Sequence, residues 1–178
     1  MATISAPKPA EPLVSVEEYL GSIYHPDCEY IDGRIEERNL GQFDHALFQA
    51  LLASLFTNNG QAWSIRTLTE WRAQVSSTHF RIPDVTVIRR GLPKEPILTH
   101  PPLIAIEILS PGDRRGQVEE KLDDYFAFGI ENIWIFDTER RTVQIATPGG
   151  LQLVTNDELT VPGTPIRVVP SELFAQLD

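Results

Sequence analysis

Two acidic residues interrupt two short apolar segments that otherwise have the composition of buried β-strands. Asp84 lies within residues 82–88 and Glu107 lies within residues 103–109. Apolar runs of this length, rich in β-branched residues and bordered by Pro or Gly, predict buried strands. A carboxylate inside such a strand loses its hydration and needs a compensating partner, most often a cation. Two of them on neighbouring elements predict a site for a divalent metal ion.

A helix is expected directly after the second strand. Residues 117–128 carry apolar side chains at helical spacing, and Gly129 is a typical residue at which a helix ends. On a helical wheel Lys121 falls at the margin of the buried stripe. An isolated lysine there usually extends its ammonium to water, but beside two strand carboxylates a functional role is favoured. The helix also has four acidic residues that we expect on its solvent side, namely Glu119, Glu120, Asp123 and Asp124.

Two further residues are candidate auxiliary site residues. Asp32-Gly33 predicts a two-residue β-hairpin in which Glu29 faces Glu36. Like charges directly opposite cost stability unless a cation intervenes, so Glu29 is either a site residue or an exposed residue at the hairpin edge. His45 begins an amphipathic helix expected over residues 45–56, where it is either a cap or packing residue or a group that faces the substrate.

The composition limits the class of protein. A chain of 178 residues with a net charge of −10 predicts one domain over residues 13–178, preceded by a flexible tail over residues 1–12. The negative charge argues against broad affinity for nucleic acid but allows a local basic patch. Five cations follow the two predicted strands and either lie near the site or are ordinary loop charges: Arg89, Arg90, Lys94, Arg114 and Arg115.

The expected compartment is the cytoplasm. Cys28 is the one cysteine, which excludes a disulfide framework and suits a reducing environment. The sequence has no apolar run of about 20 residues, so no membrane span is expected.

Several segments together resemble the Uma2 family, a branch of the PD-(D/E)XK nuclease superfamily. The resemblance covers about residues 15–145 and rests on these pieces in this order: residues 15–20, residues 29–35, His45, residues 83–85, residues 106–111, Lys121, Tyr125, Gly129 and residues 134–137. The superfamily usually has a lysine two positions after the second acid, where this chain has Leu109. In this family the lysine looks displaced onto the following helix, at the position of Lys121.

The resemblance implies a fold and a set of active-site residues. The implied fold is α+β and restriction-endonuclease-like, with a central mixed β-sheet flanked by helices and an N-terminal β-hairpin extension. The implied catalytic residues are Asp84, Glu107 and Lys121, with Asp84 and Glu107 as metal ligands and with Glu29 and His45 as possible auxiliary residues.

These residues predict a Mg²⁺-dependent endonuclease that cleaves DNA. Carboxylate oxygens suit Mg²⁺ or Mn²⁺, and the lack of a Cys/His cluster argues against zinc. Cleavage of both strands of a duplex favours a homodimer. Two alternatives stay open: a nuclease-fold binding or regulatory module without turnover, which the acidic composition favours, and a metal-dependent hydrolase acting on a small phosphoester.

Overall fold

The larger of two main β-sheets has six strands. The computed structural model describes residues 12–38 and 42–178, so the tail expected over residues 1–12 lies outside the described residues except for Pro12. Across the sheet the strands follow the order β10 (Gly150–Leu153), β9 (Thr142–Thr147), β8 (Ile133–Asp137), β7 (Ile104–Leu109), β6 (Val85–Arg89) and β3 (Ile65–Thr69). Strands β7 and β8 are parallel and the other neighbours are antiparallel. The sheet is therefore mixed, as expected.

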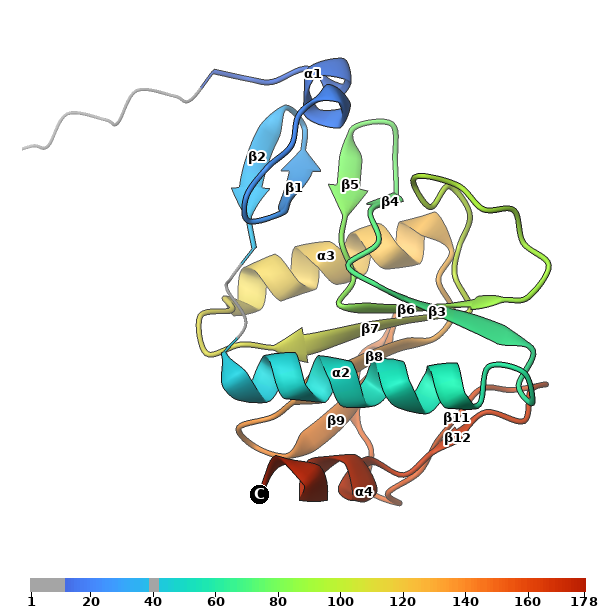
Figure 1. Ribbon diagram of the computed structural model, residues 1–178. Helices are drawn as coiled ribbons and strands as arrows, with labels where there is room; N and C mark the ends of the chain where they lie inside the picture. Colours follow the sequence, from blue (N-terminus) through green and yellow to red (C-terminus); the bar gives the residue numbers. More distant parts are fainter. Residues whose placement is uncertain (1–11, 39–41) are drawn as a thin grey trace, which may run out of the picture.

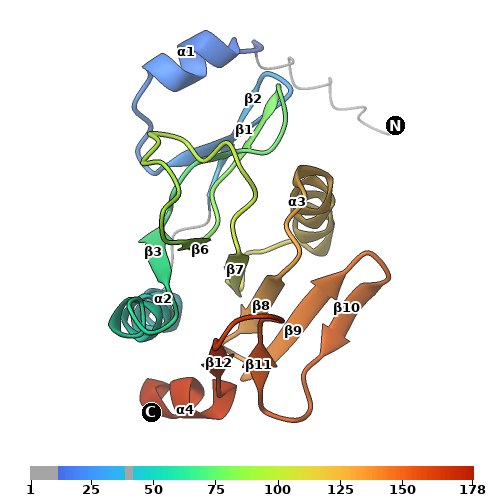
Figure 2. The same cartoon turned by 90° about the vertical axis from the view of Figure 1, so that its right-hand side faces the viewer.

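Helices cover both faces of this sheet (Figures 1 and 2). Helix α2 (Phe43–Asn58) lies on one face, together with the short helix α4 (Pro170–Phe174) and the one-turn 3₁₀ helix η1 (Ala175–Leu177). Helix α3 (Arg115–Phe128) lies on the other face and connects the parallel strands β7 and β8. A parallel pair needs such a crossover, and Gly129, with a φ of 96°, ends the helix as expected.

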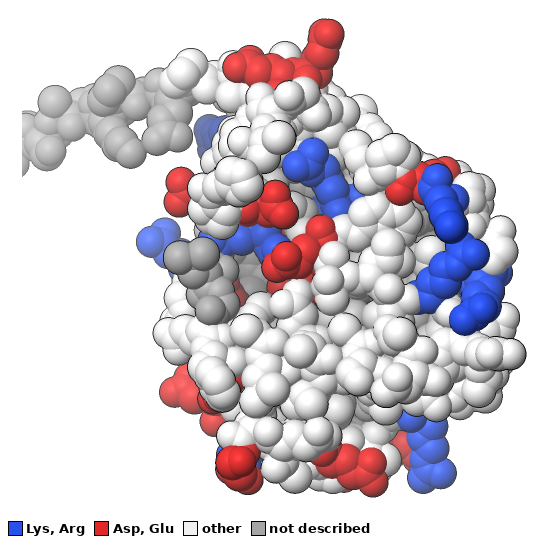
Figure 3. Space-filling view, in the orientation of Figure 1, with Lys and Arg blue, Asp and Glu red and all other residues white. Residues whose placement is uncertain are grey.

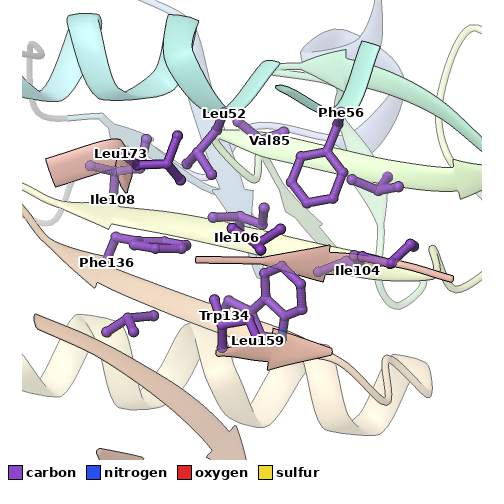
Figure 4. Close-up of a cluster of buried hydrophobic side chains, with 14 of the residues drawn as sticks. Leu52, Phe56, Val85, Ile104, Ile106, Ile108, Trp134, Phe136, Leu159 and Leu173 are labelled. Carbon is purple, nitrogen blue, oxygen red and sulfur yellow. The ribbon is translucent and has the colours of Figure 1, made fainter. Parts of the chain in front are cut away.

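The main hydrophobic core lies between the sheet and helices α2 and α4 (Figure 4). In the central strands β6, β7 and β8 its buried members come from alternate positions, such as Ile104, Ile106 and Ile108 of β7. The residues between them belong to the opposite face, where Ala105 packs beneath α3. This period of two places the Glu107 side chain on the α3 face.

A second sheet of four strands stands above the α3 face. Its order is β2 (Arg34–Glu37), β1 (Cys28–Ile31), β5 (His79–Arg81) and β4 (Ala73–Gln74). Strands β1 and β2 are the predicted hairpin, with Glu29 opposite Glu36. The sequence did not indicate β5, which joins the hairpin to the rest of the chain. Helix α1 (Val16–Gly21) packs on this sheet through Tyr19, and its first turn is capped by the Ser15 hydroxyl, which accepts a hydrogen bond from the Glu18 amide.

The remaining strands, β11 (Leu159–Thr160) and β12 (Arg167–Val168), form a short antiparallel pair. Among the described residues, the helices are too short or too polar to cross a bilayer. The strand expected from residue 82 begins at Val85, because Pro83 has no N–H to donate to a ladder. Asp84 therefore lies at the entrance of β6, directly before its first residue.

Candidate functional site

The two strand acids lie opposite each other. Val85 of β6 is the partner of Ile106 on β7, so the antiparallel register brings Asp84 against Glu107. The Oδ2 atom of Asp84 accepts a hydrogen bond of 2.8 Å from the Ile108 amide, which ties the Asp84 side chain to β7. Both side chains are buried. The structure thus brings together the two residues predicted as metal ligands.

Lys121 reaches the same place from helix α3. Its Nζ lies 3.1 Å from Glu107 Oε2 and 2.8 Å from Glu29 Oε1. Tyr125, one turn further along α3, donates its hydroxyl hydrogen to Glu107 Oε1. Because residues four apart share a helix face, α3 presents an ammonium and a phenol to one carboxylate. The Lys121 ammonium lies against two buried carboxylates rather than in open solvent.

Glu29 belongs to this cluster, and the alternative that placed it at an exposed hairpin edge is wrong. Its side chain is only 5% exposed. Besides Lys121, it contacts Arg81, whose Nη1 donates to Glu29 Oε2 at 3.0 Å, and it accepts from the Ile82 amide at 3.0 Å. The guanidinium of Arg81 also lies 4.0 Å from Glu36. A cation therefore intervenes between the two facing glutamates of the hairpin.

Arg81 is a member of the site that the sequence did not indicate. It is the last residue of β5, it is 2% exposed, and its Nε donates to Asp124 Oδ2 at 2.5 Å. Asp124 also contacts His79 Nδ1 at 2.7 Å, so its expected position on the solvent side of α3 is wrong. The reason is that the second sheet covers that side of the helix. A helical wheel cannot anticipate a neighbour whose strand was not recognised.

Asp84 has two further partners from other elements. Arg38, which follows β2, places Nη2 at 2.5 Å from Asp84 Oδ1. His45, in the first turn of α2, places Nε2 at 3.4 Å from Asp84 Oδ2. The structure thus brings His45 to the site, as the auxiliary assignment requires, whereas no pattern in the sequence indicated Arg38.

The two facing carboxyl groups have opposite pKa shifts. Burial raises the pKa of Glu107 to about 7; Lys121 opposes this shift and the charge of Asp84 adds to it. Burial acts in the same direction on Asp84, but the hydrogen bond from His45 and the charge of Arg38 outweigh it and hold the Asp84 pKa below its ordinary value. Near neutral pH, Asp84 is ionised and Glu107 titrates. Such a divergence between neighbouring acids is common at functional sites.

A cavity of about 100 Å³ opens onto these groups and is lined by Glu29, Arg38, Asp84, Glu107 and Lys121, among others. At roughly 30 Å³ per molecule, it has room for about three waters. In the described part of the chain, no group of three or more His, Cys, Asp or Glu side chains is arranged to hold a metal ion. Mg²⁺, however, is commonly held by one or two carboxylates while waters and phosphate oxygens fill the other positions.

Asp84 and Glu107 therefore fit such an ion by the chemistry of their oxygens. An ion bound to Asp84 Oδ1 would have to displace the Arg38 guanidinium.

Three of the five cations that follow the strands do not lie near this site. Arg89, Arg90 and Lys94 come after the far end of β6, one strand length from Asp84. Arg115 begins α3 close to the site end of β7, but it is 92% exposed and pairs with Glu119. The alternative that placed Arg89, Arg90 and Lys94 beside the carboxylates is wrong, because β6 carries them away from the site.

Comparison with known proteins identifies a family and a solved structure with the same fold. The family model Uma2, described as "Putative restriction endonuclease", matches residues 16–173. A crystal structure described as that of "a putative nuclease belonging to DUF820 from Anabaena variabilis ATCC 29413" superposes with a TM-score of 0.79 at 23% identity, covering 93% of this chain and 99% of that one. This likeness shows a shared fold.

A structure of a DrdV–DNA complex aligns with a TM-score of 0.42 at 16% identity, over 72% of this chain and 10% of that chain, which is too weak to support an argument. A search of curated proteins gives no match.

Proposed function

The chain belongs to the Uma2 family, and from this membership together with the site we propose that it is an endonuclease that hydrolyses phosphodiester bonds of DNA with Mg²⁺ or Mn²⁺ as cofactor. The observation that carries the proposal is the pair Asp84 and Glu107, which face each other in a small cavity beside the Lys121 ammonium. The Anabaena variabilis protein, which has the same fold, is described as "a putative nuclease".

Asp84 and Glu107 are the residues that would hold the metal ion. A bound divalent cation lowers the pKa of a coordinated water and offsets negative charge on a phosphodiester. Glu107 suits this role because burial and the charge of Asp84 disfavour its ionised form when no further cation is present. A cation in the cavity would reverse that effect.

Lys121 is the group proposed to stabilise the charge that develops on the phosphate. Its ammonium stays protonated, because the carboxylates of Glu107 and Glu29 outweigh the effect of burial and raise the Lys121 pKa. Those two carboxylates also fix its position, and a fixed charge stabilises a transition state without the cost of reorganisation. Glu29 is in turn held by Arg81 and the Ile82 amide.

Arg38 is proposed to contact substrate as well. In the structure its guanidinium compensates the ionised Asp84. A cation at Asp84 would release this guanidinium, and a free guanidinium at the cavity wall can donate two parallel hydrogen bonds to phosphate oxygens. Two copies of the chain, related by twofold symmetry, would supply one such site for each DNA strand.

A binding or regulatory module without turnover is the second candidate. The observation that favours it is the same ion pair between Arg38 and Asp84, which occupies one of the carboxylate oxygens a metal ion would need. The net charge of −10 also disfavours a general nucleic-acid enzyme. Cleavage assays separate the two candidates.

The test is the conversion of supercoiled plasmid to nicked and linear forms by the full-length protein in Mg²⁺, in Mn²⁺ and in EDTA. Glu107→Gln is the variant to compare with the wild type, because it keeps the size and polarity of the side chain but removes its charge. We expect cleavage by the wild type with metal only, and none by the variant. Equal cleavage by wild type and Glu107→Gln, or cleavage in EDTA, would contradict the proposal. A folded wild type that does not cleave with either ion would favour the binding module.

A further inference from the structure

The cations of the described chain fall into two groups. Seven lie within 4.0 Å of a carboxylate oxygen: Arg38, Arg81, Arg115, Lys121, Arg140, Arg141 and Arg167. For the other seven, no carboxylate of residues 12–38 or 42–178 lies that close: Arg34, Arg66, Arg72, Arg89, Arg90, Lys94 and Arg114. Four of this second group, Arg66, Arg89, Arg90 and Lys94, gather at the far end of β6 and of its partner β3. We call these four residues the β3–β6 patch.

The backbone pairing brings the patch together. Arg89 ends β6 opposite Ile65, and Arg66 of β3 stands opposite Ile88. In the space-filling view, blue side chains gather over this end of the two strands, at the right of the molecule (Figure 3). Arg89, Arg90 and Lys94 are exposed, and Arg66 is half-buried. The patch is thus a local concentration of positive charge in a protein whose net charge is −10.

The β3–β6 patch borders a cavity, and hydrogen bonds fix the orientation of two of its arginines. Arg66, Arg90 and Lys94 line a cavity of about 470 Å³ whose wall includes the half-buried ring of Trp71. Arg90 Nε donates to the carbonyls of Gly60 at 3.1 Å and Ile65 at 3.2 Å, and Arg66 Nη1 donates to the Leu92 carbonyl at 3.3 Å. These bonds orient the two guanidiniums but use few of the five N–H groups that each one carries. The others can serve an anion.

We propose that the β3–β6 patch binds the phosphate backbone of duplex DNA at a point remote from the cleavage site. This inference rests on the proposed function and adds to it the surface along which the substrate lies. The acidic residues elsewhere repel a polyanion, so a single cluster of cations steers it to one side of the molecule. One acid, Glu95, also lines the cavity, and its partners are Thr99 and His100.

The distance between patch and site suits a duplex. Strand β6 has five residues, so at about 3.3 Å per residue its far end lies roughly 17 Å from Asp84. Helix α2 runs alongside it: His45 at the start of the helix contacts Asp84, and Gly60 beyond its end accepts a bond from Arg90. One turn of B-DNA is about 34 Å. A duplex with one phosphodiester at the site can therefore place backbone phosphates, about half a turn away, on the patch.

The test compares two double variants that carry the same change in charge. Arg89→Glu/Lys94→Glu reverses two exposed cations of the patch whose side chains make no hydrogen bond within the described chain. The control Arg34→Glu/Arg167→Glu reverses two exposed cations elsewhere, with the loss of one exposed surface pair to Glu158, which contributes little to stability. Thermal unfolding establishes that both variants are folded. Binding of each full-length protein to a fluorescent duplex of about 30 bp, or about three helical turns, is then measured by anisotropy in metal-free buffer.

The patch variant is expected to bind at least about tenfold more weakly than the control. For the patch variant, the slope of the logarithm of the binding constant against the logarithm of the salt concentration, measured between about 50 and 200 mM, should be smaller by about two units. Each unit corresponds to one phosphate that the variant no longer neutralises. Equal affinity and slope for the two variants would overturn the inference. Failure of the wild type to bind the duplex would overturn it as well.

Plasmid cleavage, run in parallel, separates this inference from the proposed function. A wild type that binds through the patch but does not cleave would leave the patch standing and refute the endonuclease. A wild type that cleaves, beside a patch variant that binds and cleaves like the control, would refute the patch alone.

Discussion

The charged residues at the two ends of strand β6 have opposite environments. At its entrance, the buried carboxylate of Asp84 is contacted by Arg38, by His45 and by the Ile108 amide. At its exit, Arg89 and Arg90 are exposed and have no carboxylate within 4.0 Å in the described chain. The entrance holds buried charges of opposite sign in contact with one another, whereas the exit holds exposed charges of one sign.

Burial explains the difference. A buried charge without a partner costs several kcal/mol, so the site end can exist only if nearly every charge is compensated. An exposed cation is hydrated and needs no partner, so the patch end can keep its charge for a ligand. The same substitution should therefore have very different consequences at the two ends.

The largest effect is expected for Arg81→Met. It removes the cation between Glu29 and Asp124 and leaves two carboxylates poorly compensated, which should lower the free energy of unfolding by about 3–5 kcal/mol. The matched change at the patch end, Arg89→Met, should alter it by less than about 0.5 kcal/mol. Urea unfolding of both variants measures the difference. A similar decrease in the free energy of unfolding in the two variants would contradict the proposed difference between the two ends of β6.

The pH dependence of stability should differ between the ends as well. The pKa of Glu107 is about 7 in the folded protein and 4.5 ordinarily. Between these values the unfolded carboxyl group releases its proton while the folded one keeps it. In buffer without divalent cations, the wild type should therefore lose stability as pH rises through this window, by on the order of 3 kcal/mol.

Glu107→Gln cannot titrate, so it should lack this component of the pH profile. The wild-type free energy of unfolding minus that of the variant should fall from pH 4.5 to pH 7. Lys94→Met, at the patch end, should keep the wild-type profile. A constant difference between wild type and Glu107→Gln across this range would contradict the raised pKa.

Lys121→Met is expected to have a smaller effect on the free energy of unfolding but a clear effect on the rate of DNA cleavage. The variant keeps the apolar stem and loses the ammonium that touches Glu107 and Glu29. It should stay folded, because Glu29 keeps Arg81 as a partner and Glu107 can hold a proton. Cleavage of plasmid should fall by about 10²-fold or more, equivalent to about 2.7 kcal/mol. Cleavage at the wild-type rate would reduce Lys121 to a structural residue.

The smallest effect is expected for Lys94→Ala at the patch. One exposed cation contributes about one unit to the salt slope of DNA binding, and its loss should weaken binding equally for all sequences. The melting temperature should not change. An unaltered slope in an anisotropy titration would mean that Lys94 does not contact the backbone.

The architecture could be predicted because periodicity and length identify its main elements. Residues 103–109 are a short apolar run rich in β-branched residues, the hairpin at Asp32-Gly33 has a strong turn signal, and the helix that ends at Gly129 has helical spacing. Family resemblance then supplied the fold into which these elements assemble. Of the named site residues, Asp84, Glu107 and Lys121 are brought into one cluster, and Glu29 and His45 lie in contact with it.

The cationic half of the site could not be predicted. Arg38 and Arg81 lie outside any strong periodic segment, and β5 has only three residues, which is too short for an alternation to be recognised. Arg38 is separated from its partner Asp84 by 46 residues along the sequence, and Arg81 is separated from its partner Glu29 by 52. Such pairings depend on how the two sheets stack, and single-sequence patterns contain no information about that.

The most direct test of the central claim, that the entrance of β6 is a cation site, is a calorimetric titration of Mn²⁺ into the wild type, Asp84→Asn and Glu107→Gln at one pH. The account predicts that the wild type binds the ion and that neither folded variant does. Each variant loses one of the two carboxylates, and the remaining one is held by Arg38 or by Lys121. Equal Mn²⁺ affinity in all three proteins would contradict it.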